Sequence, residues 1–486
     1  MLEIQKVFDI EEYLNTHRKK QSMQGILDSN SRFLVLCSKI KKHIDEEWLK
    51  EQNVENTQRL LDRQKNAILG KATEVNYLKD KIREYLKVNK LESEQHPRWY
   101  RNLVDAVFHE NWGIAGIAEW MDMPDSSSAK IIGNRIYFFI DGKQQLQEQK
   151  ITHKRFEQLR KALLMSDERK RLNENYSEVY METGERVTIY TDKLVIDGQP
   201  SMVFRKYIID KLTFEEQASR NTIPAEAIPA FEALVKCGVR IAFTGPVRSG
   251  KSTLLVTWEI NEKDDLEGIF LQTDPEIRMH DIKPKAPIIS IIADGKQLYD
   301  LSKQIVRADG NYIVVTEVRD GYAAYIAVEA ANKGTNRVKI TLHLGRAEKF
   351  AYNMANKIYS VFGGNLKYLI EDVANSFDYI FEMTELPSSR NQKRLKAIYE
   401  MSFDFDTNEV VYHKICEYLP ETDSWAFDYY VGKNVCKIGE FENTVALQVF
   451  NDTLLALSKK YPMKNESIVR KSYQNINEED NGQEEG

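Results

Sequence analysis

The sequence predicts an α/β fold: a C-terminal domain with a parallel-rich sheet, preceded by an α+β domain and a helical N-terminal extension. Three observations carry this prediction. From residue 230 onward, short aliphatic runs alternate with helix-like segments, which is typical of a parallel sheet covered by helices. Between 120 and 215, β-rich runs are broken by Gly and Asp around one helix-like segment. Residues 59–86 place apolar side chains three and four positions apart, the period of an amphipathic helix.

These changes of pattern divide the 486 residues into successive segments. A helical extension is expected at 1–95 and the α+β domain at 96–218. The turn signals in SRNTIPAEAIP predict a linker at 219–230, and the α/β domain follows at 231–463. Residues 464–486 end in NEEDNGQEEG, whose five acids and lack of large apolar side chains predict a disordered acidic tail.

Within the C-terminal half, the pattern becomes antiparallel after residue 390. The run RLKAIYEMSFDFDTNEVVYHKICEYL predicts a β-hairpin that turns at DTNE. Further on, TVALQVFNDTLLALSKKY predicts a helix. The parallel part of the sheet is therefore expected to carry an antiparallel extension.

The composition is that of an ordinary globular protein, with 42% hydrophobic and 29% charged residues. A net charge of −6 argues against a chain whose main task is to neutralise nucleic-acid phosphates, so no direct nucleic-acid contact is expected. The N-terminal stretch MLEIQKVFDIEEYLNTHRKK lacks a cationic segment followed by an apolar core, so no secretory signal peptide is expected. No apolar run approaches the roughly 20 residues of a membrane-spanning helix. We therefore expect a cytoplasmic protein.

The stretch GPVRSGKST (245–253) lies between a strand-like and a helix-like segment. It fits the pattern G-x-x-x-x-G-K-[ST], in which convergent loop amides hold phosphates, the lysine reaches the β- and γ-phosphates and the hydroxyl ligates Mg²⁺. Here these roles fall to Lys251 and Ser252; the alternative, an ordinary glycine-rich turn, would leave the lysine without a partner. The predicted phosphate-binding residues are Gly245, Pro246, Val247, Arg248, Ser249, Gly250, Lys251, Ser252 and Thr253.

A second motif, RADGNYIVVTEVRDGYAA (307–324), is an aliphatic strand that ends in Glu317, followed by Arg319 and a helix. In P-loop enzymes an acid at the tip of a neighbouring parallel strand handles Mg²⁺ or the attacking water. Glu317 is therefore the candidate catalytic acid and a candidate Mg²⁺ ligand. The alternative is a solvated acid at a strand end.

Together, GPVRSGKST, VVTEVRDG and ITLH (340–343) resemble the nucleotide-binding domain of the type II/type IV secretion ATPases, the traffic ATPases of tight-adherence pili and conjugation. The resemblance implies a RecA-like P-loop NTPase domain that binds ATP and Mg²⁺. It also implies that Glu317 and Arg319 belong to the Walker B segment and that His343 belongs to the histidine box. Without this resemblance, a single histidine at the end of a strand is more often a structural residue.

The resemblance extends upstream to GERVTI (184–189) and VFRKYI (203–208). It implies that Arg186 and Arg205 bring positive charge to the nucleotide, where an arginine stabilises the charge of a transferring phosphate. The alternative for each arginine is a surface ion pair.

The stretch FLQTDPEIRMH (270–280) occupies the place of the family's acidic box. Asp274 or Glu276 could orient the attacking water, although Gln272 and Thr273 stand where one alignment expects acids. The alternative is a turn that ends a strand, because Asp-Pro favours one. Three further departures are Thr316 and Arg337, which stand where relatives have glycine, and Asn311, which stands where relatives often have Asp.

The resemblance implies a homo-hexameric ring in which ATP lies between two domains of one subunit and hydrolysis rocks one domain against the other, with a candidate hinge near 213–230. Such a motor docks peripherally on the cytoplasmic membrane through an integral membrane platform protein and powers pilus assembly, secretion or conjugation. Two alternatives stay open. The departures leave room for a nucleotide-binding ring scaffold with little turnover, and the loop alone also fits a DNA-handling P-loop ATPase.

Overall fold

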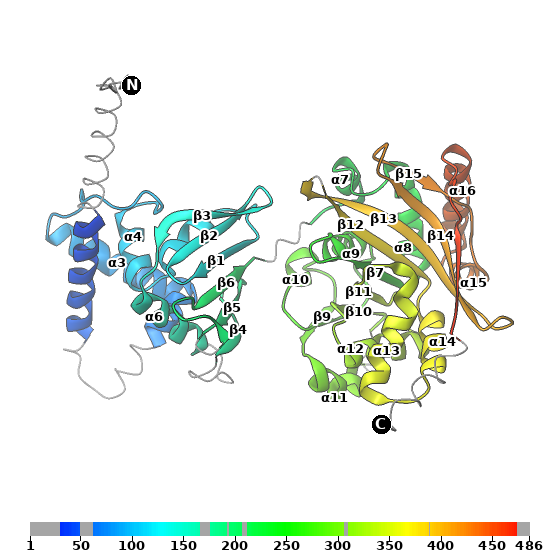
Figure 1. The fold of residues 1–486 in the computed structure, drawn as a ribbon, viewed down its shortest axis with the longest axis horizontal. Coiled ribbons are helices and arrows are strands. Elements are labelled where there is room, and N and C mark those ends of the chain that lie inside the picture. Colours follow the sequence, from blue (N-terminus) through cyan, green and yellow to red (C-terminus); the bar gives the residue numbers. More distant parts are fainter. Residues whose placement is uncertain are drawn as a thin grey trace, which may run out of the picture. The chain divides into compact units, whose positions relative to one another are not determined.

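The computed structural model describes residues 30–48, 62–165, 175–191, 194–206, 211–305, 310–387 and 389–473. The chain divides into two compact units, unit 1 (Met1–Ile208) and unit 2 (Ile209–Gly486), and Figure 1 shows the elements of each. The first 29 residues of the predicted helical extension and the ten residues at the predicted acidic end lie outside the described residues.

Unit 1 combines helices with an antiparallel sheet. Residues 30–48 and 62–68 are helical, followed by α3 (Ala72–Val88), α4 (Leu103–Asn111), η1 (Ala115–Ile117), α5 (Ala118–Met121) and α6 (His153–Leu164). The strands are β1 (Ser128–Ile132), β2 (Arg135–Ile140), β3 (Lys143–Lys150), β4 (Tyr176–Tyr180), β5 (Arg186–Tyr190) and β6 (Ser201–Arg205). They form a sheet in the order β3-β2-β1-β6-β5-β4, and each neighbouring pair is antiparallel.

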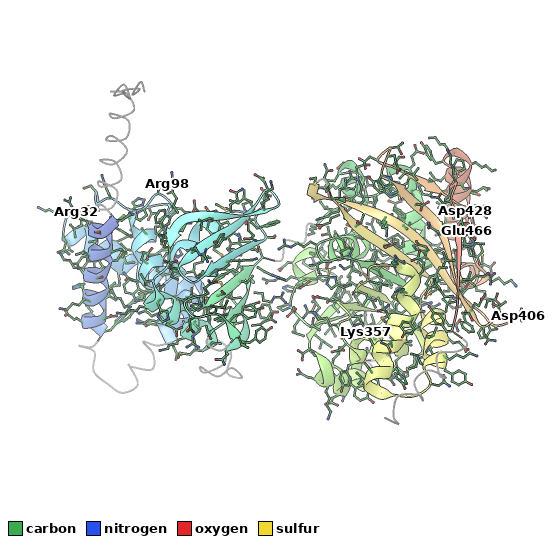
Figure 2. The ribbon with its side chains drawn as sticks, viewed as in Figure 1. Arg32, Arg98, Lys357, Asp406, Asp428 and Glu466 are labelled. Atoms are coloured by element: carbon green, nitrogen blue, oxygen red, sulfur yellow. The ribbon has the colours of Figure 1, made fainter. Side chains whose placement is uncertain are left out.

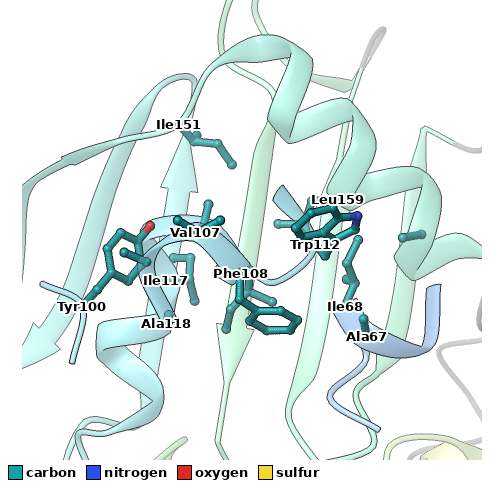
Figure 3. Close-up of a cluster of buried hydrophobic side chains, with 14 of the residues drawn as sticks. Ala67, Ile68, Tyr100, Val107, Phe108, Trp112, Ile117, Ala118, Ile151 and Leu159 are labelled. Carbon is teal, nitrogen blue, oxygen red and sulfur yellow. The ribbon is translucent and has the colours of Figure 1, made fainter. Parts of the chain in front are cut away.

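The core of unit 1 lies where α4 and α6 meet the first helices (Figure 3). The helix α4 begins at an N-cap, because the Asn102 side chain accepts a hydrogen bond from the Asp105 amide. Phe108, Trp112 and Leu159 are buried there. This core explains the amphipathic period of residues 59–86, whose apolar side chains include the fully buried Leu78 and Ile82 of α3.

Unit 2 is larger and alternates strands with helices. Its helices are α7 (Phe214–Ser219), η3 (Ala225–Ala227), α8 (Ile228–Cys237), α9 (Lys251–Ile260), α10 (Met279–Ile282), α11 (Gly295–Ile305), α12 (Gly321–Asn332), η4 (Ala347–Lys349), α13 (Phe350–Phe362), α14 (Leu366–Ser376), α15 (Lys433–Glu442) and α16 (Thr444–Lys460). Its strands are β7 (Ile241–Gly245), β8 (Gly268–Gln272), β9 (Ile288–Ile292), β10 (Tyr312–Thr316), β11 (Lys339–His343), β12 (Tyr379–Leu386), β13 (Ser389–Asp404), β14 (Glu409–Leu419), β15 (Ser424–Phe427) and β16 (Ile468–Ser472).

The strands of unit 2 form one sheet in the order β15-β14-β13-β12-β7-β11-β10-β8-β9, with β16 paired to β14. From β12 to β9 the neighbours are parallel, and the other pairs are antiparallel. The predicted fold class is therefore confirmed. The hairpin expected at DTNE is also confirmed, because β13 and β14 pair up to Asp404 and Glu409.

The structure differs from the sequence prediction at the predicted linker, 219–230. Thr213 and Glu216 form a capping box that starts α7, and the chain continues through η3 into α8. Phe214 and Ile223 are buried in the core of unit 2. The prolines that suggested a turn lie at helix starts instead, where the missing amide hydrogen costs nothing, as at the first turn of α8.

The predicted disordered tail, 464–486, is corrected in its first part. Residues 468–472 form β16, which pairs with β14 from Ile468↔His413 to Ser472↔Glu409. Most side chains of this edge strand are exposed, and the strand is held by backbone pairing with β14. Its sequence IVRKS therefore needs no alternation of apolar and polar residues, and this left no signal for a strand.

Candidate nucleotide-binding site

The site lies where four parallel strands of unit 2 end. β11 pairs with β7 up to His343↔Gly245, and β10 pairs with β8 up to Thr316↔Gln272. Because parallel strands place their carboxyl ends at one edge of the sheet, the segments that follow these strands lie side by side. The motifs that the sequence separates by more than ninety residues therefore meet at this edge (Figure 1).

The glycine loop connects β7 to α9, and its two glycines are needed for its shape. Gly245 has φ 139° and Gly250 has φ 92°, both in the region that side chains disfavour. A Cβ on Gly245 would lie 2.2 Å from the carbonyl oxygen of Met383. Gly250 is the N-cap of α9, so the loop leads into a helix N-terminus, whose free amides and positive end favour an anion.

Lys251 folds back onto this loop. The side chain is buried, and its Nζ donates to the carbonyl oxygens of Gly245 at 3.0 Å and Pro246 at 2.6 Å. Burial lowers the pKa of Lys251 to about 8, against smaller opposing effects of Glu317 and Glu276. An ammonium group held by neutral carbonyl groups is a strong binding partner for an anion.

His343, at the end of β11, joins Lys251 to Glu317. Its Nδ1 lies 3.1 Å from Lys251 Nζ, and its Nε2 lies 3.3 Å from Glu317 Oε1. An ammonium group can only donate, so this arrangement requires Nδ1 to accept and leaves the proton on Nε2, facing the carboxylate. The imidazole therefore connects the phosphate loop to the acid of β10.

Glu317 follows β10 with φ 54°, a left-handed conformation that costs a non-glycine residue about 1 kcal/mol. Two contacts to β11 hold it there: its amide donates to Thr341 Oγ1 at 2.6 Å, and the amide of Val318 donates to the Thr341 carbonyl oxygen at 2.8 Å. Burial alone would raise the pKa of Glu317, but hydrogen bonds from His343 and Arg319 outweigh it and lower the pKa to about 2. Glu317 is therefore a carboxylate throughout the physiological range.

Arg319 ties Glu317 to the acidic segment after β8. One nitrogen, Nη2, lies 2.6 Å from Glu317 Oε2 and 2.8 Å from Asp274 Oδ2. The backbone of Arg319 is held as well, because Lys357 of α13 (Figure 2) donates to its carbonyl oxygen at 2.7 Å. The guanidinium group of Arg319 thus holds the carboxylates of Asp274 and Glu317 close together, although these residues follow different strands.

The donor set suits Mg²⁺. Asp274, Glu276 and Glu317 each offer a carboxylate oxygen, and these oxygens lie within 4.8 Å of one another. Hard carboxylate oxygens are what Mg²⁺ prefers, and Mg²⁺ usually takes only one or two of them beside phosphate oxygens and water. Ser252, the predicted hydroxyl ligand, lies in the first turn of α9, next to Lys251.

Two residues of this site, Gln272 and Thr341, were not predicted from the sequence to be site residues. The Gln272 side chain exchanges two hydrogen bonds of 2.9 Å with the backbone of Ile277, which shapes the segment that carries Asp274 and Glu276. Thr341 holds the Glu317 amide. In the sequence, each of them is a polar residue inside a strand of buried residues. Such a residue indicates a buried hydrogen bond but does not identify the partner.

The structure brings together Lys251, His343, Glu317, Arg319, Asp274 and Glu276 from the candidate residues. Val247 and Arg248 are exposed on the loop, and Arg248 has φ 66°. Arg186 and Arg205 belong to unit 1, where they are cross-strand neighbours on β5 and β6. Arg186 is buried there and Arg205 is exposed.

The departures from the family pattern are accommodated within unit 2. Thr316 is buried at the end of β10. Arg337 is buried beside α8, where its Nη1 donates to the Val235 carbonyl oxygen at 2.9 Å and its Nη2 pairs with Glu442 at 3.1 Å. Arg337 therefore has structural partners outside the site.

A parallel sheet with a glycine loop and lysine after one strand, and an acid after another, defines a P-loop NTPase domain. Residues 154–370 match the family model "Type II/IV secretion system protein". This part of the chain, a little under half of its length, is thus similar to that family.

Individual relatives are distant. An uncharacterized protein of Methanocaldococcus jannaschii, MJ0900, is 22% identical over 274 residues, which are 54% of this chain and 47% of the relative. The chain thus spans about half the length of this curated relative.

Solved structures with similarity to the chain include three ATPases. The pilus retraction motor PilT with bound ADP is 17% identical, with 71% of this chain and 92% of that one covered and a TM-score of 0.45. The ATPase DotB of Legionella pneumophila is 16% identical, with 60% and 81% covered and a TM-score of 0.43. The VirB11 ATPase of the Brucella suis type IV secretion system, in complex with sulphate, is 14% identical, with 58% and 92% covered and a TM-score of 0.32.

None of the helices in the described part of the chain is both long enough and apolar enough to cross a membrane.

Proposed function

We propose that the protein is a Mg²⁺-dependent ATPase that powers assembly of a pilus or of a secretion or conjugation apparatus. The observation that carries the proposal is the contact chain from Lys251 through His343 to Glu317, at the strand ends beside the glycine loop. It joins a cation suited to a phosphate to a carboxylate suited to a water molecule. The family match of residues 154–370 supports the link to secretion systems.

The loop and Lys251 bind the substrate, MgATP, in this proposal. Loop amides and the N-terminus of α9 receive the phosphates, and Lys251 exchanges its carbonyl partners for phosphate oxygens. Each carbonyl contact is neutral, whereas a phosphate is charged, so the exchange strengthens the hydrogen bonds of the ammonium group.

Glu317 orients the attacking water, and its low pKa keeps it in the carboxylate form that this task needs. Asp274 or Glu276 shares the task from the neighbouring segment. Ser252 and Glu317 would hold Mg²⁺, which when bound neutralises charge on the phosphates. Arg319 keeps the carboxylates in place through its two contacts.

Conversion to mechanical work involves the rest of the molecule. We infer that Arg186 and Arg205 of unit 1 bring further positive charge to the nucleotide and that six copies form a ring. A ligand drives a conformational change only if it binds two states differently, and arginines on a second unit supply such a difference. The motor would work at the cytoplasmic membrane through an integral platform protein.

The test measures phosphate release from MgATP by the purified protein and by a Lys251→Ala variant. Removal of the lysine is expected to lower the rate about 100-fold or more, because it removes charge stabilisation of the transferred phosphate. Lys333→Ala, which alters an exposed ion pair of α12, is the matched control and should leave the rate unchanged. Equal rates in the wild type and in Lys251→Ala would refute the ATPase proposal.

The ring is tested separately, by the mass in solution with and without a non-hydrolysable ATP analogue. If nucleotide bridges the units, the analogue favours the assembled form by mass action. A monomer under both conditions, at concentrations that saturate the site, would refute the hexamer.

A further inference from the structure

The strand β12 continues past the end of its neighbour. It pairs with β7 from Tyr379↔Ile241 to Glu382↔Thr244, and then runs on to Leu386, while β7 turns into the glycine loop at Gly245. β13 stays paired with β12 along this continuation. Two antiparallel strands thus project beside the loop, and we call residues 383–386 and 393–395 the overhang (Figure 1).

The overhang lies beside the loop at both of its glycines. The carbonyl oxygen of Met383 lies so close to Gly245 that a Cβ there would come within 2.2 Å. At the other end of the loop, a Cβ on Gly250 would meet Lys393 Cγ at 3.5 Å, Lys393 Cβ at 3.6 Å and Met383 Cε at 3.7 Å. A Cβ would thus fit at ordinary van der Waals distance, so Lys393 and Met383 line the space beside the residue that caps α9, with no more than about a methyl group of room between them and Gly250.

Lys393 is fixed in place by its cross-strand partner. It stands opposite Glu385 in the register of β12 and β13, and its Nζ donates to Glu385 Oε2 at 3.2 Å. Both side chains are partly buried, at 23% and 29% exposed. A half-buried pair on two hydrogen-bonded strands holds a long side chain in one rotamer better than a pair on the open surface.

Positive charge gathers on this side of the loop. Burial lowers the pKa of Lys393, and the charge of Arg248 lowers it further, while Glu385 acts in the opposite direction. Arg248 lies in the loop itself, so the overhang and the loop influence each other electrostatically. Lys393 on the overhang and Arg248 in the loop are therefore close enough to interact, while Lys393 keeps its pair with Glu385.

We propose that Lys393 is a positioning residue for the glycine loop: its stem limits the space into which Gly250 can move, and its bond to Glu385 anchors that boundary to the sheet. This inference rests on the proposed nucleotide-binding function. Since Gly250 opens the helix whose amides receive the phosphates, a displaced Gly250 misdirects those amides. The contacts of Glu317 to His343 and Arg319 do not involve the overhang, so binding should suffer and the chemical step should not.

The test compares Lys393→Ala, Lys393→Met and Lys393→Arg, with dissociation constants for ADP and KM and kcat for MgATP as readouts. Lys393→Ala is expected to weaken ADP binding and to raise KM about fivefold, a loss typical of one removed contact, with kcat within about twofold of the wild type. Lys393→Met keeps the stem, and Lys393→Arg keeps the stem and a charge that can pair with Glu385. Both should therefore recover most of the affinity.

The matched control is Lys396→Ala. Lys396 also lies on β13 and also pairs across to β12, with Glu382 at 2.8 Å, so its removal costs the hairpin an ion pair without altering the overhang. It should bind ADP like the wild type. Equal losses in Lys393→Ala and Lys396→Ala would show a general effect on the hairpin and overturn the inference, as would wild-type affinity in Lys393→Ala. A fall in kcat without a change in KM would overturn it too.

Failure of this inference is distinguishable from failure of the proposed function. If the wild type itself binds neither ADP nor MgATP, the nucleotide-binding proposal falls. If the wild type binds and the Lys393 variants bind equally well, only the positioning role falls. Thermal unfolding of each variant keeps the comparison to folded protein: a midpoint for Lys393→Met near that of the wild type, together with a fivefold loss of affinity, would overturn the role of the stem.

Discussion

Two buried lysines lie at opposite ends of the same sheet and have opposite surroundings. Lys339 begins β11 and is fully buried, with Glu259 Oε1 at 2.9 Å and Glu262 Oε1 at 2.8 Å. Lys251 lies near the other end of that strand, and its Nζ contacts two carbonyl oxygens and the imidazole of His343. The carboxylates outweigh the effect of burial and raise the pKa of Lys339, whereas burial lowers the pKa of Lys251.

The difference separates a structural charge from a functional one. Lys339 is neutralised inside the folded chain, and its partner Glu259 belongs to the same helix, α9, that Lys251 opens. It therefore fixes α9 against β11. Lys251 is held by weak neutral acceptors, which an anion can replace without breaking an ion pair. The carboxylates around Lys339 anchor α9 to the sheet at one end of β11. The neutral carbonyl groups around Lys251 leave its charge available to an anion at the other end.

The largest expected effect concerns Lys339. Lys339→Met leaves the buried Glu259 carboxylate without its ion-pair partner and leaves Glu262 with Arg337 at 3.8 Å, so the free energy of unfolding should fall by about 3 to 5 kcal/mol. Denaturant unfolding followed by tryptophan fluorescence, to which the buried Trp258 of unit 2 contributes together with five other tryptophans, measures this.

The exposed pair Lys333 and Glu329 supplies the control for this measurement. It lies on α12 with side chains 54% and 30% exposed, and Lys333→Ala should cost less than about 0.5 kcal/mol. If Lys339→Met lowers the free energy of unfolding by as little as Lys333→Ala does, Lys339 is not the structural charge that the comparison with Lys251 makes it.

The next effect concerns catalysis by Glu317, at the carboxyl ends of the parallel strands. Glu317→Gln keeps an acceptor for Arg319 but removes the carboxylate charge, so kcat should fall about 100-fold while nucleotide affinity changes only a few-fold. Steady-state phosphate release and ADP titration give the two numbers. Glu329→Gln on α12 is the matched control. If Glu317→Gln hydrolyses MgATP at the wild-type rate, the acid has no part in the chemistry.

The residues at the carboxyl ends of the strands could be predicted from the sequence, because the glycine loop and Glu317 each lie in a short motif between a strand and a helix. The alternation of strands and helices predicted the parallel sheet for the same reason. The contact of His343 with Lys251 is different. It depends on β11 lying beside β7, and a sequence shows that a strand exists without showing its neighbours.

The structural charges carry even less sequence signal. Lys339, Glu259 and Glu262 are common surface residue types, and only burial by the completed sheet turns them into a cluster. β16 escaped prediction for a related reason, since it is held by the backbone of β14 and not by apolar side chains. Tertiary pairing, not local pattern, decides such cases.

A smaller effect follows from the pKa of Lys251, about 8 in the empty protein. Below pH 8 the lysine is protonated before binding, so affinity for ADP should not change with pH. Above pH 8 binding must first restore the proton, and affinity should fall about tenfold between pH 7 and pH 9. Isothermal titration across this range tests it, and Lys251→Met should lose most of the dependence. An affinity that stays constant up to pH 9 would show that Lys251 keeps its ordinary pKa.

The smallest expected effect is that of Lys251→Met on stability. Without nucleotide, this substitution should hardly alter the free energy of unfolding. The pKa of Lys251 is lower in the folded chain than its ordinary value of 10.5, so burial of the charge destabilises the fold below about pH 8. That cost fades as the pH rises toward 10.5, where the unfolded chain loses the proton as well. Methionine removes the cost but also removes two hydrogen bonds to loop carbonyls and one to His343, each contributing about 1 kcal/mol. The two changes offset each other, so the free energy of unfolding at pH 7 should shift by less than about 1 kcal/mol, and a loss as large as that of Lys339→Met would show that Lys251, too, is part of the structural scaffold.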